Sequence, residues 1–209
     1  MRTLLLDPGI AHTGAAFATF KHTTKPTAPK VSWVRLLETT GLTKKKRKSE
    51  KVSKTQDDIR RIQACMLAIR GLIEETQPDL IIAEAPIGGA RSSAAVKYLA
   101  MCTAVLAAIN TWFPDIPVIY LSPFDVKKGF CGSHKAEKSD IIARALRKHG
   151  NVPGWPTNKA GELMSEAKLE HCADAIAILY AALNLGAIHG SPANSPHKSH
   201  TNAARKARR

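Results

Sequence analysis

The sequence lacks the long hydrophobic runs that direct a chain into or across a membrane. Near the N-terminus only Leu4, Leu5 and Leu6 are consecutive apolar residues, whereas the core of a signal peptide needs about 7 to 15. The most apolar stretch, at residues 100–109, falls short of the about 20 residues that cross a bilayer. We therefore expect no export signal and no membrane span, and we place the protein in the cytoplasm.

Cysteine is scarce and shows no pattern. The four cysteines contain no C-x-x-C pair and stand far apart, at Cys65, Cys102, Cys131 and Cys172. This spacing argues against a zinc ribbon and a disulfide framework, and it favours a reducing compartment. With 44% hydrophobic residues in 209, the chain is long enough to bury one sizeable core. We expect one domain over residues 1–188, without an internal repeat, and a tail over residues 189–209.

Acidic residues are few, and this deficit is concentrated in two segments. The chain has 31 Lys and Arg against 17 Asp and Glu, a net charge of +14. A basic insert at residues 43–55 contains Glu50 as its only acid beside Lys44, Lys45, Lys46, Arg47, Lys48, Lys51 and Lys54. The tail contains no acid and is too polar to fold alone. Clustered charge in two flexible arms favours contacts with the phosphates of a nucleic acid over a merely solubilising role. The run KKKRK also matches a nuclear import signal, and this use stays open.

Hydrophobic periodicity predicts three strands first and alternating helices and strands afterwards. The expected strands are at 3–6, 14–20, 31–37, 80–83 and 118–121, with a hairpin tip at 22–30. The expected helices are at 59–73, 92–112, 135–149 and 165–185, and a loop rich in Gly and Pro occupies 150–164. This order predicts an α/β protein with a five-stranded mixed sheet flanked by helices, which is the ribonuclease H-like order of elements.

Potential metal ligands stand where these elements end. Asp7 ends the first strand, Glu84 ends the fourth, and His171 and Asp174 lie on the last helix. If the first and fourth strands are parallel neighbours, both carboxylates emerge at the carboxyl edge of the sheet, where α/β proteins bind ligands. His171 and Asp174 are three residues apart, so they share one helix face. Each residue also has an ordinary explanation, such as a turn for Asp7, so the set carries more weight than its members.

The chemistry of these side chains predicts divalent cations. Carboxylate oxygens in a basic protein suit Mg²⁺, with Mn²⁺ as a substitute. Two such ions about 3.5 to 4 Å apart can activate a water and stabilise a leaving 3′ oxygen. Glu170 and Glu166 are rival ligands on the last helix, because Glu170 shares a face with Asp174. The sequence does not decide between them and His171.

Five short motifs, in order, resemble the RuvC-type Holliday-junction resolvases over about residues 1–188. They are L-L-L-D-P-G with T-G at 13–14, I-I-A-E-A-P, S-P-F-D-V-K-K, A-E-K-S and H-C-A-D-A-I-A-I. The resemblance implies that Asp7, Glu84 and Asp174 are metal-binding carboxylates and that His171 is the fourth ligand. It also implies that Lys127 and Lys138 serve the scissile strand, with Lys138 close to the chemistry. The residues expected to bind DNA are Lys44, Lys45, Lys46, Arg47, Lys48, Arg91, Lys127, Lys128 and Lys135.

The chain departs from this family in ways that bear on specificity. Where members often carry an aromatic shortly after the catalytic glutamate, this chain has Pro86 and Ile87, which puts strand separation at the crossover in doubt. The basic insert, the loop at 150–164 and the basic tail resemble additions of the phage-encoded branch. A looser wedge and more phosphate contacts would extend cleavage to flaps and forks. The resemblance further implies a homodimer paired through the helix at 92–112, so that paired nicks fall on opposite strands.

The sequence thus predicts a metal-dependent, structure-selective DNA endonuclease acting in a bacterial or phage-infected cell. A ribonuclease H-like enzyme that cuts the RNA of a hybrid is the alternative within the fold. A non-catalytic junction-binding protein is an alternative of another class, although the full set of acidic positions argues against it. An actin-like sugar kinase is disfavoured, since such kinases repeat the fold and need a longer chain.

Overall fold

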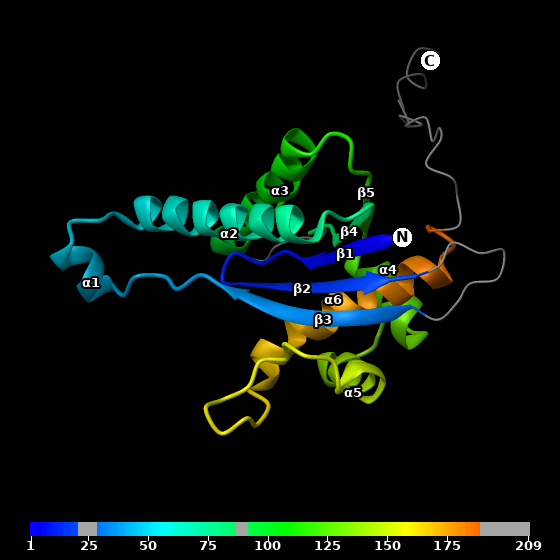
Figure 1. The fold of residues 1–209 in the computed structure, drawn as a ribbon. Coiled ribbons are helices and arrows are strands. Elements are labelled where there is room, and N and C mark those ends of the chain that lie inside the picture. The colour runs from blue at the N-terminus through cyan, green and yellow to red at the C-terminus, as the bar shows by residue number, and fades with distance from the viewer. Residues whose placement is uncertain (21–28, 87–91, 189–209) are drawn as a thin grey trace, which may run out of the picture.

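A computed structural model describes residues 1–20, 29–86 and 92–188. Its centre is a five-stranded mixed sheet in the order β3-β2-β1-β4-β5 (Figure 1). The first three strands form an antiparallel meander, while β4 runs parallel to β1 and β5 parallel to β4. The strands are β1 (Arg2–Asp7), β2 (His12–Thr19), β3 (Lys30–Glu38), β4 (Leu80–Glu84) and β5 (Val118–Leu121). All five predicted strands and the mixed sheet are confirmed, whereas the predicted hairpin tip falls mostly on residues 21–28, outside the described part.

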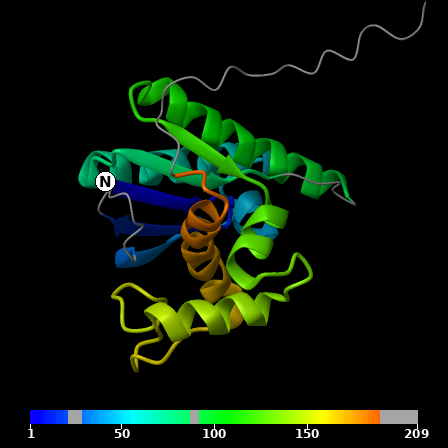
Figure 2. The ribbon, with the colours of Figure 1, turned by 90° about the vertical axis from the view of Figure 1, so that its right-hand side faces the viewer.

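Helices cover both faces of the sheet, and β1 separates two apolar cores (Figure 2). Successive strand residues point to opposite faces, so Leu5 packs in one core while Leu4 and Leu6 pack in the other. The first core is covered by α4 (Pro123–Cys131), α5 (Lys138–His149) and α6 (Glu166–Asn184). The second is covered by α2 (Lys54–Thr76) and α3 (Ser93–Trp112). Burial on both faces explains why β1 and β4 read as unbroken apolar runs.

The basic insert is folded, which corrects the prediction of a flexible arm. It contains the helix α1 (Lys44–Ser49), whose first turn is capped by the Thr43 side chain. The segment is tied to α2, because the Asp57 carboxylate accepts the Leu42 N–H at 2.8 Å and also binds Arg60. Composition alone suggested disorder, but two local capping signals, at Thr43 and Ser53, begin helices inside the charged run.

The element order contains one further helix that the sequence reasoning missed. The nine residues of α4 follow β5 directly, with Ser122 as N-cap and Pro123 in the first turn, and Gly132 ends the helix at φ +80°. The predicted third helix consequently begins at Lys138 and not at residue 135. The loop at 150–164 is confirmed; the Val34 N–H donates to the Pro153 carbonyl at 3.0 Å and ties it to β3.

The helix α3 has 20 residues, whereas the expectation of no membrane span was based on the shorter apolar stretch at residues 100–109. By length and composition alone, it is the one helix among the described residues that could cross a bilayer. Length therefore does not exclude a span for this helix. Its buried side, which includes Met101, Val105 and Ile109, packs in the core with α2 and the sheet, while only 28% of its most apolar window is buried. Most of α3 thus faces outward in the single chain.

Candidate active site

The carboxyl edge of the sheet brings Asp7 and Glu84 together. Leu6 of β1 is in register with Ala83 of the parallel strand β4, so the next residues, Asp7 and Glu84, leave the sheet side by side. Glu84 is in turn in register with Leu121, the last residue of β5. The prediction that both acids emerge at one edge is confirmed. The four residues that precede each acid in its strand are buried, whereas Asp7 and Glu84 themselves are partly exposed.

The helix α6 crosses this edge and contributes His171 and Asp174. It approaches β2 so closely that a Cβ at Gly14 would lie 1.8 Å from the His171 carbonyl oxygen. Gly14 is the register partner of Asp7. The glycine therefore lets α6 descend onto the sheet, and the His171 Nδ1 reaches the Asp7 Oδ2 at 2.6 Å. Sequence reasoning noted the T-G pair only as part of a motif and did not assign it this role.

The acids of the site repel one another in surroundings that exclude most water. Burial and the carboxylates of Asp7 and Asp174 raise the pKa of Glu84 to about 9. Burial, together with Asp7 and Glu170, raises the pKa of Asp174 to about 8. Burial lowers the pKa of His171, but its hydrogen bond to Asp7 and the nearby carboxylates outweigh this and raise it overall. Clustered acids with such pKa values mark a place where positive charge is needed.

Two lysines expected from the sequence lie beside these acids. Lys138, the first residue of α5, forms an ion pair with Glu170, and this contact raises the pKa of the Lys138 ammonium. Lys127 of α4 donates to the Ala136 carbonyl at 3.0 Å, and its charge acts on Glu84. Glu170, the rival ligand on this helix, is thus paired with a lysine, and its charge also raises the pKa of Asp174. The two lysines place positive charge at the rim of the acidic edge.

The donor set has the chemistry that Mg²⁺ requires. Asp7, Glu84 and Asp174 offer carboxylate oxygens from three different elements, and His171 adds a ring nitrogen. The rival Glu166 is exposed in the first turn of α6. Within the described residues no three His, Cys, Asp or Glu side chains already form a finished metal-binding group.

The predicted DNA-binding residues divide into two groups, both outside the acidic edge. Lys44, Lys45, Lys46, Arg47 and Lys48 form α1, which has no buried residue and lies beyond the edge at which β1 and β4 end (Figure 1). Lys128 and Lys135 are exposed at α4 and at the loop that follows it. Arg91 lies outside the described residues. The first group is separated from the active-site acids, whereas the second adjoins them through Lys127.

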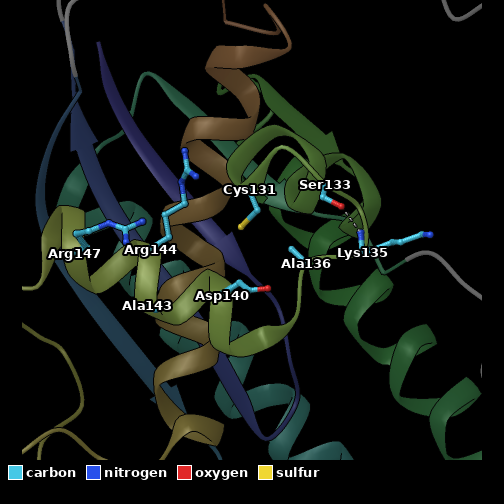
Figure 3. A pocket seen from close by; sticks show the side chains of 8 residues that line it. All are labelled: Cys131, Ser133, Lys135, Ala136, Asp140, Ala143, Arg144 and Arg147. Atoms are coloured by element: carbon cyan, nitrogen blue, oxygen red, sulfur yellow. Dashed lines mark hydrogen bonds between the residues drawn. The ribbon is translucent and has the colours of Figure 1, made fainter.

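A basic groove of about 440 Å³ lies between the end of α4 and α5 (Figure 3). Its charged lining residues are Lys135, Asp140 and two arginines that the sequence analysis did not name, Arg144 and Arg147, so the balance is positive. The Arg144 guanidinium lies 5.3 Å from the Phe130 ring, and its buried Nε has no hydrogen-bond partner among the described residues. In Figure 3, Arg144 and Arg147 rise on one side of the groove, and Lys135 points outward on the other. The R-x-x-R spacing on one helix face could have indicated this surface.

The sequence matches no protein-family model and no curated protein. Solved structures, however, share the fold. Thermus thermophilus RuvC is 16% identical with a TM-score of 0.58, and the match covers 90% of this chain and 97% of that protein. The yeast mitochondrial Holliday junction resolvase is 15% identical with a TM-score of 0.55, covering 88% of this chain and 78% of the other. The Fowlpox virus resolvase, solved with its substrate Holliday junction DNA, is 13% identical with a TM-score of 0.50, covering 88% and 99%. The chain therefore has the ribonuclease H-like fold of RuvC-type resolvases.

Proposed function

We propose that this protein is a metal-dependent, structure-selective endodeoxyribonuclease that nicks four-way junctions and other branched DNA, such as flaps and forks. The observation that carries the proposal is the gathering of Asp7, Glu84, His171 and Asp174 at one edge of the sheet. The strong positive charge of the chain supports a nucleic acid as the substrate. Solved structures that share its fold include those of Holliday junction resolvases.

In this proposal each polar residue of the site has a distinct task. Asp7, Glu84 and Asp174, with His171, would hold two Mg²⁺ ions, and Mn²⁺ would substitute for them. Bound there, the ions would activate a water for attack on phosphorus and stabilise the leaving 3′ oxygen. The hydrogen bond between His171 and Asp7 fixes the ring and the carboxylate relative to each other. Lys138 would offset the negative charge of the reacting phosphate once it leaves Glu170.

Phosphate contacts away from the chemistry would hold the substrate. The exposed lysines of α1 and the basic tail would bind backbone phosphates without reading the base sequence. The groove lined by Arg144 and Arg147 is a third basic surface. Ala136 belongs to its lining, and Lys127 donates a hydrogen bond to the Ala136 carbonyl, so the groove adjoins the active-site lysine. Such contacts would favour branched DNA by gripping more than one arm at once.

The proposal includes a homodimer paired through α3. Its support is the exposed apolar side of this helix, where Val96 is 55% exposed and Ala100, Ala104 and Ala107 are also exposed. Small side chains at spacings of three and four residues allow two helices to approach closely. A two-fold dimer would place two acidic edges on one junction and permit paired nicks.

Cleavage of matched substrates tests the proposal directly. Labelled four-way junction, flap, linear duplex and RNA–DNA hybrid are incubated with Mg²⁺ or EDTA, using wild type, Asp7→Asn and the exposed-site control Asp115→Asn. We expect metal-dependent nicks in the branched DNA from wild type and from the control, and none from Asp7→Asn. Cleavage of the hybrid alone would favour a ribonuclease H-like activity, and binding without any cleavage would favour a structural role. Unchanged cleavage by Asp7→Asn would refute the metal-site assignment.

A further inference from the structure

The first turn of α4 exposes an aromatic ring that folding does not explain. Phe124 is 53% exposed, whereas Val126 and Phe130 of the same helix are buried in the core. Aromatic residues make up only 5% of this chain, and a phenyl ring left in water forgoes the favourable free energy of burial. The ring is not isolated, because it stacks on His134 with centroids 4.5 Å apart and ring planes 18° apart. Two exposed rings thus form one ordered pair on the surface.

The chain places this pair beside the acidic edge. Leu121, three residues before Phe124, is the register partner of Glu84, and the Ala85 N–H donates to its carbonyl at 2.8 Å. One turn of α4 after Phe124 stands Lys127, whose charge acts on Glu84. The short connection between β5 and α4 therefore fixes the pair next to the proposed reaction site. An exposed aromatic ring is thus present at this edge, and α4 contributes it.

Two exposed lysines lie near the two rings. Lys128 is exposed four residues after Phe124, on the same side of α4 by helical spacing. Lys135 is adjacent to His134 in the chain and points outward from the loop (Figure 3). Exposed aromatic rings interleaved with lysines are the combination that binds unpaired nucleotides, since the rings stack on bases and the lysines neutralise phosphates.

We propose that Phe124, backed by His134, is a stacking platform for a nucleobase that leaves its helix at the branch point of the DNA. This inference rests on the proposed function, because it requires a branched DNA substrate at the acidic edge. The stack on His134 holds the Phe124 ring in one orientation, so little conformational entropy is lost when a base packs against it. The platform discriminates branched from linear DNA, because only the former offers a base that is easily unstacked.

A thermodynamic cycle between the protein and the base tests the platform. Dissociation constants are measured in EDTA by fluorescence anisotropy, for an intact four-way junction and for one with abasic residues at the branch point. Phe124→Ala should bind the intact junction about tenfold more weakly than wild type, since base stacking on an aromatic contributes about that much. Removing the bases should weaken wild type by a similar factor but leave Phe124→Ala nearly unchanged.

Matched variants separate stacking from charge and from packing. Phe124→Trp should retain wild-type affinity, whereas Phe124→Leu should behave as Phe124→Ala, because leucine is apolar but does not stack. Leu67→Ala removes another exposed apolar side chain, 68% exposed on α2, and should bind as wild type does. All of these variants keep the charge of the wild type, so the dependence of affinity on salt should stay the same. Affinity for linear duplex should be unaffected.

The outcomes keep this inference distinct from the proposed function. An unchanged junction affinity in Phe124→Ala, or an equal loss on linear duplex, overturns the platform even where cleavage is normal. Conversely, the expected cycle without any Mg²⁺-dependent cleavage supports the platform and refutes the nuclease. A wild-type protein that does not bind the junction overturns both. Thermal unfolding of each variant verifies that the compared proteins are folded.

Discussion

Replacing Gly14 with alanine tests how the fold positions the active site. A Cβ at this position would lie 1.8 Å from the carbonyl oxygen of His171, whereas ordinary van der Waals contact begins at 3.4 Å. The β2 and α6 backbones must therefore separate by roughly 1.6 Å, because both contacting atoms belong to the main chain and cannot rotate away. The hydrogen bond between His171 and Asp7, now 2.6 Å, would be broken by the same movement.

The size of the effect follows from what α6 buries. Ala173, Ile176 and Leu179 are fully buried in the core that α4, α5 and α6 cover, so α6 cannot move without opening that core. Forcing extra atoms into a packed interior costs about 1–3 kcal/mol, and we expect the upper end here. A displacement of about 1 Å in a catalytic group lowers rates about 100-fold, so Mg²⁺-dependent cleavage should fall by about that factor in the folded fraction.

Urea unfolding gives the measurement, and Gly71 gives the control. A Cβ at Gly71, in the middle of α2, would meet nothing within 4 Å. Gly71→Ala should therefore stabilise the protein by about 0.5–1 kcal/mol through helix propensity. Opposite signs for the two substitutions are the expected result. A Gly14→Ala protein as stable and as active as wild type would refute the close approach of α6 to β2.

Three further predictions concern the basic insert, the dimer and the tail. Asp57 is almost completely buried, and its bonds to Arg60 and to the Leu42 N–H hold its pKa below the ordinary value. The stability that it contributes is therefore present above about pH 4 and is lost as the pH falls further. Asp57→Asn should make the melting temperature depend less on pH in the acid range, and an unchanged dependence would argue against these bonds of Asp57. Ala104→Glu should convert a dimer to monomers in analytical ultracentrifugation, with Leu67→Glu, at a 68% exposed position of α2, leaving the dimer intact; a monomeric wild type would dismiss pairing through α3. Deleting residues 189–209, with its five Lys and Arg, should weaken binding to all DNA and reduce the slope of log affinity against log salt by up to about 0.9 for each phosphate that the tail neutralises; an identical salt slope would mean that the tail binds no phosphate.

The sheet and its acidic edge could be predicted because both depend on local patterns and one general rule. Apolar runs ending in Asp7 and Glu84 define two strands. The third and fourth strands are joined through a helix and therefore run parallel, and the meander makes the first strand parallel to the third. Parallel neighbours finish at the same edge, so the two acids meet provided that the first and fourth strands lie side by side. The register of Leu6 with Ala83 in the structure is the consequence.

The two short helices, α1 and α4, were not predicted because a single N-cap residue is a weaker indication than charge composition or hydrophobic periodicity. In α1, six mostly charged residues have no apolar face, and only the cap at Thr43 indicates a helix. In α4, the S-P-F-D-V-K-K motif contains an N-cap serine and a first-turn proline, but nine residues give too little periodicity to identify. The helix α4 is stabilised by burial of Val126 and Phe130 in the core, which a window of sequence does not show.

Contacts between distant segments were beyond prediction for a different reason. The ion pair of Lys138 with Glu170 and the groove around Arg144 depend on how α5 packs against α4 and α6. Nothing in the spacing of these residues states which helix faces meet. The stack of Phe124 on His134 is similar, because it forms only when the loop after α4 folds back toward the first turn of that helix.

Thr13 and Gly14, near the start of β2, carry no charge, yet they determine where the charged side chains of the site lie. The Thr13 hydroxyl donates to the Gly9 carbonyl at 2.8 Å and so closes the turn that follows Asp7. Thr13 is itself buried, and its neighbour Gly14 clears the space that α6 needs. One residue thus sets where Asp7 leaves its strand, and the next sets how near His171 comes to it. Because both functions need a small or hydroxyl side chain and not a charged one, a search restricted to ionisable residues finds the groups of the site but not the reason for their arrangement.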